Sequence, residues 1–200
     1  MRNLLLAAVS CAVLTGAAAL PAAAAPLAAA PSQAGLAGNA DAISDAELRS
    51  FAEAMKAVRP IAAAAGSAPT AEQQAQMAAA IEASGLALTR FNAISAAVSA
   101  DPVVRARAEL AATDPSPAGS AAAAVTDAEV DQFSVAMAAV QPIAAALNGA
   151  APNAEQQAQM AAAIEASGLA LERFNAISGA VSQDAHLRAR LAVADARRNS

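Results

Sequence analysis

The chain has 200 residues, of which 57% are hydrophobic and only 2% aromatic, and its formal net charge is −5. Few aromatic and β-branched residues disfavour a β-sandwich or barrel, and phosphates would repel an acidic chain that lacks aromatic platforms, which argues against nucleic-acid binding. A single cysteine and a single histidine exclude a disulfide framework within the chain and a cysteine-based zinc site. We therefore expect an all-α protein without a metal or other cofactor.

The first 24 residues have the layout of a secretory signal peptide. Arg2 supplies a positive start, and Leu4–Leu20 is an uncharged run of apolar and small residues that a proline ends. Cleavage is expected after Ala24. The mature protein is then periplasmic or secreted, with no stable membrane span. The alternatives are an uncleaved membrane span and a lipoprotein site at Cys11.

The rest of the sequence repeats itself. The segment AEQQAQMAAAIEASGLAL occurs at 71–88 and again, unchanged, at 154–171. The offset between the copies grows from 82 to 83 residues, so the second copy carries one inserted residue between Ile143 and Ala154, which marks an exposed turn. We expect two homologous helical repeats, called the first repeat and the second repeat, over 41–111 and 125–198.

Two stretches lack a periodic apolar face and separate these parts of the chain. Residues 25–40 are rich in alanine, proline, glycine and serine, and they predict a flexible tether after the signal peptide. Residues 112–124 contain the run Asp-Pro-Ser-Pro-Ala-Gly-Ser, a composition typical of a linker between the repeats.

Each repeat is expected to fold into a small module of four helices. The first helix opens with a capping box, Ser44 with Glu47 and Thr126 with Glu129. Apolar residues three and four apart follow on one side of this helix: Leu48, Phe51, Met55 and Val58. Pro60 and its counterpart in the second repeat should kink or end the helix, because proline removes a backbone donor and clashes with the preceding turn.

The other helices are predicted from caps and apolar spacing. In the first repeat Thr70 with Gln73 opens the second helix, Gly85 closes it, and Asp101-Pro102 opens the fourth. The third helix is expected to bury Leu88, Phe91, Ile94 and Val98. The corresponding caps of the second repeat are Asn153 with Gln156, Gly168 and Asp184. Because alanine-rich modules of this size bury little apolar area, we expect the repeats to pack on each other or the protein to dimerise.

The motifs of both repeats resemble the bacterial domain-of-unknown-function family 4168. The first repeat carries them at Ser44–Phe51, Gly85-Leu86, Phe91–Ile94 and Asp101–Val104, and the second at Thr126–Phe133, Gly168-Leu169, Phe174–Ile177 and Asp184–Leu187. The resemblance covers all but the leader, tether and linker, and it implies an exported helical protein without an assigned activity. Ala87 and Ala170 stand where the family has a serine cap, and Ala185 where it has a proline, so these helix starts should be weaker, by about 1 kcal/mol for a lost cap.

Two polar pairs recur at equivalent positions, Arg90 with Asn92 and Arg173 with Asn175. They are the candidate partner-binding residues, because a cation beside an amide, present twice, provides a duplicated corner for an anion or a protein. The alternative is structural: each asparagine bonds a neighbouring backbone turn beside a solvated arginine.

The other polar residues are expected to serve structure. His186 has no histidine or cysteine partner and is expected to be merely exposed. The recurring glutamates are expected on solvated helix faces: Glu72, Glu82, Glu155 and Glu165. Ser84, Ser95 and Ser99 recur without a base at a predictable position. Arginines of the fourth helices are expected to complement the dipole near the helix C-terminus, with an anionic partner as the alternative: Arg105, Arg107, Arg188 and Arg190, followed by Arg197 and Arg198.

These observations predict a non-catalytic interaction or structural module of the cell envelope, and not an enzyme. Its partner is expected to be an envelope protein or a second copy of the chain, and not nucleic acid. The alternative is a carrier of a small apolar ligand, since methionines on helical faces line adaptable cavities: Met55, Met77, Met137 and Met160. A third hypothesis, an enzyme built on the repeated carboxylates, requires two of them to face one cleft.

Overall fold

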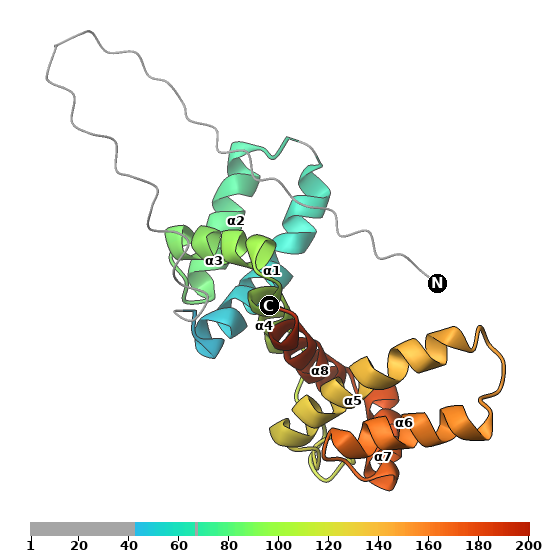
Figure 1. Ribbon diagram of the computed structural model, residues 1–200. Helices are drawn as coiled ribbons and strands as arrows, with labels where there is room; N and C mark the ends of the chain where they lie inside the picture. The colour runs from blue at the N-terminus through green and yellow to red at the C-terminus, as the bar shows by residue number, and fades with distance from the viewer. Residues whose placement is uncertain (1–42, 67) are drawn as a thin grey trace, which may run out of the picture. The chain divides into compact units, whose positions relative to one another are not determined.

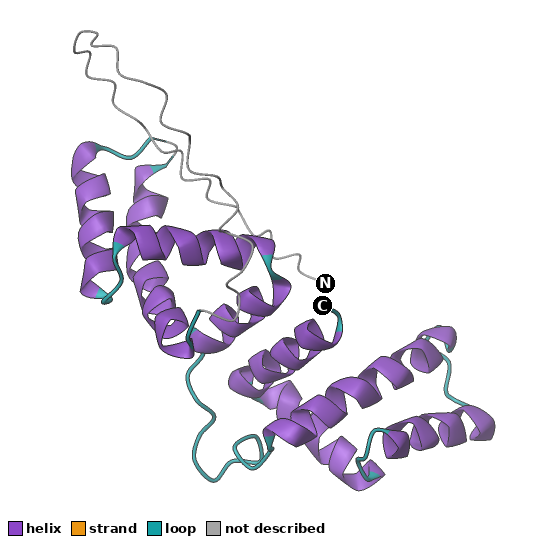
Figure 2. Ribbon diagram, turned by 60° about the vertical axis from the view of Figure 1, so that its left-hand side comes forward, coloured by secondary structure: helices purple, strands orange, loops and turns teal. Residues whose placement is uncertain are grey.

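The structure is a computed structural model that describes residues 43–66 and 68–200 (Figure 1). All regular elements of these residues are α-helices, which confirms the all-α class (Figure 2). The predicted signal peptide, the tether over 25–40 and Cys11 lie outside the described residues, as do the first two residues of the first repeat.

The described part of the chain contains eight helices, four in each repeat. The first repeat contains α1 (Asp45–Ala65), α2 (Ala71–Ala83), α3 (Leu88–Ala100) and α4 (Pro102–Ala111). The second repeat contains α5 (Asp127–Ala146), α6 (Ala154–Ala166), α7 (Leu171–Gln183) and α8 (Ala185–Arg198). Within the described ranges, no helix combines the length and the apolar character that crossing a membrane requires.

The predicted capping boxes are formed. The Glu47 N–H donates to Ser44 Oγ at 3.2 Å, and the Ser44 N–H donates to the Glu47 carboxylate at 2.9 Å. The same reciprocal bonds open α2, α5 and α6, and aspartate side chains cap α4 and α8. At Ala87 and Ala170, by contrast, no side chain among the described residues caps α3 or α7. Most helix starts are therefore fixed by residues close in sequence.

The prolines of the first helices do not end them. α1 continues past Pro60 to Ala65, and α5 continues past Pro142 to Ala146. Of the two predicted outcomes, a kink or an end of the helix, the end was wrong. A proline removes one backbone hydrogen bond, but here it is followed by isoleucine and a run of alanines, and alanine has the highest helix propensity. Packing of α2 on α1, and of α6 on α5, further supports the continued helix.

The inserted residue of the second repeat lies in the loop between α5 and α6. This loop turns through Asn148 (φ +47°) and Gly149 (φ +86°), whereas the loop after α1 turns at Gly66 (φ +61°). Glycine adopts a positive φ without steric cost, and asparagine tolerates it better than most residues. All three residues are exposed, as expected for a turn that accepts an insertion.

Each repeat has a hydrophobic core of its own. In each core two tilted phenylalanine rings lie together, Phe51 with Phe91 at a centroid distance of 4.9 Å, and Phe133 with Phe174 at 4.8 Å. The first core contains Ile43, Leu48, Phe51, Ala54, Ile81, Leu86, Ile94, Val104 and Ala108. The second contains Ala122, Val125, Val130, Phe133, Ala136, Ile164, Leu169, Ile177, Ala180, Leu187 and Ala194. The end of the predicted linker thus packs into the second core.

The first residue of α3 departs from the predicted burial. Leu88 is 46% exposed, and the equivalent Leu171 at the start of α7 is 45% exposed. Ile94 is buried as predicted, and Phe91 and Val98 pack against the first core. The spacing places Leu88 on the side of α3 that faces the core. However, helical side chains point toward the N-terminus, so the first one projects past the end of the helix into solvent.

The two repeats meet where α4 packs against α8. All described residues belong to one compact unit. Ala106 is 7% exposed, Ala189 9% and Val193 5%, although none of them belongs to the core of its own repeat. This contact confirms the expectation that the two repeats pack on each other.

Candidate functional site

The two candidate partner-binding arginines lie in the first turns of α3 and α7, and each binds the glutamate of a capping box. Arg90 Nε donates to Glu47 Oε1 at 2.7 Å, and Arg173 Nε donates to Glu129 Oε1 at 2.7 Å. Arg173 Nη2 also donates to Glu129 Oε2 at 3.0 Å. The positive charge that a partner would bind therefore already has a carboxylate within the same repeat.

These contacts fix the charge state of both glutamates. The Arg90 guanidinium, together with hydrogen bonds from Ser44, lowers the pKa of Glu47 from 4.5 to about 2. Arg173 in the same way lowers the pKa of Glu129 to about 2. Both arginine pKa values are raised by the same bonds. Both pairs are fully ionised near neutral pH, and an external anion would have to displace a bound carboxylate.

Asn92 and Asn175 take no part in these contacts. Both are exposed, and neither side chain forms a hydrogen bond with any described residue. The structural alternative, in which each asparagine bonds a neighbouring backbone turn, was wrong. The structure brings each arginine onto a glutamate and leaves the nearby asparagine in solvent, so the two residue types do not form one polar corner.

A second arginine of each repeat holds the segment before the first helix. Arg107 Nη2 donates to Asp45 Oδ1 at 2.7 Å and to the Ile43 carbonyl at 2.8 Å. In the second repeat Arg190 Nη2 donates to Asp127 Oδ1 at 2.6 Å, and its Nη1 donates to the backbone carbonyl just before the capping box at 2.9 Å. The fourth helix of each repeat is thereby tied to the start of the first.

A third arginine of each repeat binds the end of the preceding helix. Arg105 donates to two backbone carbonyls at the end of α3, at 3.1 and 2.9 Å. Arg188 donates to two carbonyls at the end of α7, both at 3.0 Å. These cations do complement a helix C-terminus, but the prediction that it is their own was wrong. They lie near the starts of α4 and α8, next to the negative end of the neighbouring helix.

A further polar group joins α5 to α8, and we call Ser134, Asp195 and Arg198 the α5–α8 cluster. The Ser134 side chain is buried, and its hydroxyl donates to Asp195 Oδ1 at 2.5 Å. Arg198 Nε donates to Ser134 Oγ at 3.2 Å, and its Nη2 lies 3.6 Å from Asp195 Oδ1. In the first repeat the equivalent positions hold Ala52, Ala112 and Pro115. A search for recurring residues therefore misses this cluster.

The α5–α8 cluster borders an open depression of about 290 Å³, which is also lined by Asp131, Val135, Ala194 and Arg197. A serine beside a carboxylate is a combination that can activate a nucleophile. Here the Ser134 side chain is only 1% exposed, and its hydroxyl both donates to the carboxylate and accepts from the guanidinium. The hydroxyl is thus engaged by residues of α8 on both counts, and the cluster fastens α8 to α5.

The only histidine lies in a more enclosed place than expected. His186 is half-buried, and its Nδ1 is buried without a hydrogen-bond partner among the described residues. The expectation of a merely exposed side chain was wrong, because the linker runs past the start of α8, where Ser116 Oγ donates to Asp184 Oδ1 at 2.9 Å. Within the described ranges, no three histidine, cysteine, aspartate or glutamate side chains converge on a possible metal position.

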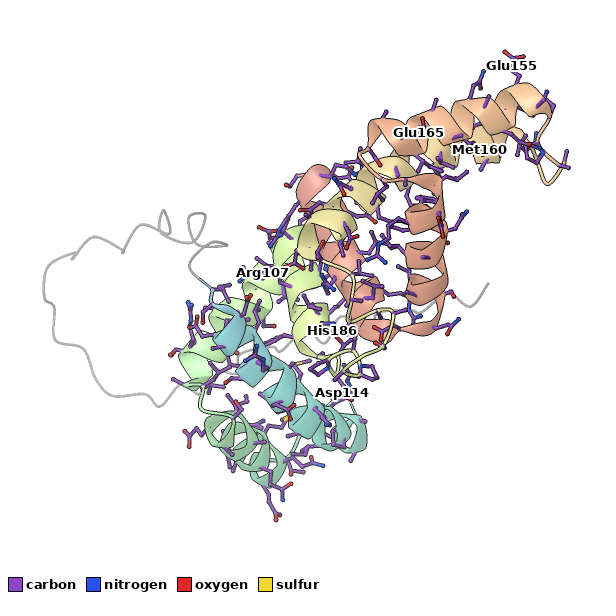
Figure 3. All side chains as sticks on the ribbon, turned by 90° about the horizontal axis from the view of Figure 1, so that it is seen from below. Arg107, Asp114, Glu155, Met160, Glu165 and His186 are labelled. Carbon is purple, nitrogen blue, oxygen red and sulfur yellow. The ribbon has the colours of Figure 1, made fainter. Side chains whose placement is uncertain are left out.

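The recurring glutamates and the methionines do not build a site either. Glu72 and Glu82 on α2 are exposed, as are their counterparts Glu155 and Glu165 on α6. Figure 3 shows Glu155 pointing into solvent at the start of α6. Met55 packs against the first core, Met137 is 38% exposed, and the lining of the depression within the described residues includes no methionine. The four glutamates therefore lie on solvated helix faces as predicted, and, among the described residues, methionine takes no part in the depression beside the α5–α8 cluster.

Comparisons with known proteins do not add a function. No protein-family model, no curated protein and no solved structure matches the chain. The resemblance to family 4168 stays a prediction, and the function has to be inferred from the residues themselves.

Proposed function

We propose that the chain is an exported, non-catalytic helical protein that acts as an interaction or structural module of the cell envelope. The signal-peptide layout of residues 1–24 supports the export. The unchanged 18-residue segment supports a tandem duplication of one four-helix unit related to family 4168. The observation that carries the non-catalytic role is that three recurring arginines of each repeat bond within their own repeat.

In each repeat, three recurring arginines connect helices to one another. They join α3 to the start of α1, α4 to the segment before α1, and α4 to the end of α3, with the same pattern in the second repeat. Alanine-rich helices bury little apolar area, so hydrogen bonds to charged groups help to define how the helices pack. These residues were copied because the unit needs them, and a repeated active site is not required to explain them.

A surface that recurs in both repeats and is available for a partner lies at the starts of α3 and α7. Leu88 and Asn92 are four residues apart, which places both on one side of α3, and both are exposed. Leu171 and Asn175 repeat this arrangement on α7. Each repeat therefore offers an exposed leucine beside an exposed amide, and an envelope protein is the partner that we propose for them.

Export is tested with the full chain carrying a C-terminal tag. We expect the tagged protein outside the cytoplasm, with an N-terminus that begins at Ala25. Leu14→Arg places a charge in the apolar run and should block export, whereas the matched Leu14→Ala should leave it intact. A wild-type protein that stays in the cytoplasm with its first 24 residues attached would rule out the proposed location.

The binding role is tested by affinity capture from envelope extracts with the mature protein. We expect one protein to be recovered repeatedly, and to be lost with the quadruple variant Leu88→Ser, Asn92→Ala, Leu171→Ser and Asn175→Ala. The matched control Glu72→Gln with Glu155→Gln changes the exposed sides of α2 and α6 and should retain the partner. Recovery of a lipid and no protein would instead favour the carrier.

A further inference from the structure

α4 and α8 are equivalent helices of the two repeats, and they pack against each other. Both helices carry the same three residues at equivalent positions, since Arg105-Ala106-Arg107 recurs as Arg188-Ala189-Arg190. This pair is the principal contact between the repeats in the described part of the chain. Two equivalent surfaces in contact are the hallmark of a two-fold homodimer, in which one patch meets its own copy.

The two helix surfaces also have matching chemistry. Ala106 and Ala189 are buried without belonging to the core of either repeat, so we assign their burial to the opposite helix. The charged neighbours are held to the side, because Arg107 binds Asp45 and Arg190 binds the equivalent aspartate of its own repeat. Each helix thus offers a small apolar residue flanked by arginines that are bound within their own repeat, and either surface suits a copy of itself.

We propose that α4 and α8 form a homotypic docking surface, and that the partner which fits it is the opposite repeat of a second copy of this chain. The inference rests on the proposed duplication. Within one chain, the segment between α4 and α5 keeps the two surfaces at high effective concentration, so the chain closes on itself. Two chains can satisfy the same surfaces by exchanging repeats, which produces a domain-swapped dimer.

A change in linker length tests the proposal in the full chain. Deleting residues 114–119 shortens the connection and removes the Ser116 contact with Asp184 at the start of α8, so that exchange between two chains should be favoured over closure within one chain. We expect the molecular mass measured by light scattering to double. A Gly-Ser insertion of the same length after Ala118, which is exposed, should leave the protein monomeric. A shortened chain that folds and stays monomeric would overturn the proposal.

Two substitutions then locate the dimer contact. Ala106→Arg and Ala189→Arg place large charged side chains in the surface, and in the shortened chain they should restore the monomer mass. Ala79→Arg, on the exposed side of α2, is the matched control and should leave the dimer intact. A dimer that persists in the double variant would show that another surface is responsible.

If the shortened chain fails to fold, the same contact can be tested by cutting the linker of the folded full-length chain. A protease site inserted after Ala118 allows the linker to be cut after folding. We expect the two halves to elute together, and to separate when Ala189→Arg is present. Halves that separate without that substitution contradict the proposed affinity. Signal-peptide cleavage is unchanged in all these variants, so their failure is distinguishable from a failure of the proposed export.

Discussion

The two repeats share one set of charged contacts and differ in another. The pair Glu47–Arg90 recurs as Glu129–Arg173 with the same distance of 2.7 Å, whereas the α5–α8 cluster has no equivalent residues in the first repeat. α8 has 14 residues and α4 only 10, and Asp195 lies just beyond the position that matches the end of α4. The shared pair joins helices that both repeats possess, and the cluster holds the extra turn of α8. The recurring ion pairs therefore mark contacts that the unit requires, and the unshared cluster marks what was added at its end.

Removing one phenylalanine ring from one core should give the largest loss of stability. It also tests whether the two repeats unfold independently. Phe133 is 2% exposed and Phe51 is 6% exposed. We expect Phe133→Ala to lower the free energy of unfolding by about 3 kcal/mol, and Phe51→Ala to cost a similar amount. Because the cores are separate, Phe133→Ala should reduce hydrogen-exchange protection in α5–α7 and spare α1–α3. Equal loss of protection in both repeats would show that they unfold as one cooperative unit.

The α5–α8 cluster predicts an effect that only the second repeat can show. We expect Ser134→Ala to lower the free energy of unfolding by about 1.5 kcal/mol, measured by urea denaturation, because a buried hydroxyl that bonds two charged groups is lost. The matched change Ala52→Ser introduces a hydroxyl at the equivalent position of the first repeat. Ala112 stands there in place of Asp195, so the new hydroxyl has no equivalent carboxylate to bind, and the free energy of unfolding should change by less than about 1 kcal/mol. A double-mutant cycle of Ser134→Ala with Asp195→Ala should show coupling between the two residues. Additive losses would contradict the cluster.

The shared pairs predict the same response to acid in both repeats. The pKa of Glu47 and that of Glu129 fall from 4.5 to about 2 in the folded protein. Their stabilisation is therefore present above pH 4.5 and is lost as the pH falls from there toward 2. Since the side chains are about one third exposed, each pair contributes about 1 kcal/mol or less.

Substituting the arginines separates this contribution from other acid effects. Arg90→Gln and Arg173→Gln should each lower stability at pH 7 and flatten its decline between pH 4.5 and pH 2.5, as followed by urea denaturation. Glu72→Gln removes an exposed carboxylate that lies outside both cores and should leave the decline unchanged. A decline that keeps its slope in both arginine variants would mean that the pairs do not stabilise the folded state.

The sequence predicts contacts well where they join residues of one helical turn. The capping box of Ser44 and Glu47 depends only on residues three apart, so its pattern is sufficient. The pair of Glu47 with Arg90 spans 43 residues. A signal for it exists, because an acid and a base recur together at equivalent positions of both repeats. The spacing alone does not predict that the two side chains form an ion pair, because this depends on how α3 packs beside the start of α1.

Two other features have no such signal. Ser134 and Asp195 are 61 residues apart and do not recur, so neither spacing nor repetition points to their contact. Leu88 shows a different limit: periodicity identifies the side of α3 that faces the core, but not how far along the helix the core extends. Both features depend on where helices end relative to their neighbours, which is a property of the tertiary fold.

The uncapped starts of α3 and α7 should give the smallest effect, and it should be the same in both repeats. Ala87 (φ −69°, ψ 146°) and Ala170 (φ −69°, ψ 147°) already have the extended backbone of a cap residue, and both are exposed. Ala87→Ser and Ala170→Ser supply the missing acceptor without rearranging the chain, so each should raise the free energy of unfolding by about 0.5 kcal/mol. Ala87→Val offers no acceptor and should not stabilise. Stability is measured by thermal unfolding. A stabilisation in one repeat alone would mean that the surroundings of the two helix starts differ, although their backbone dihedral angles match.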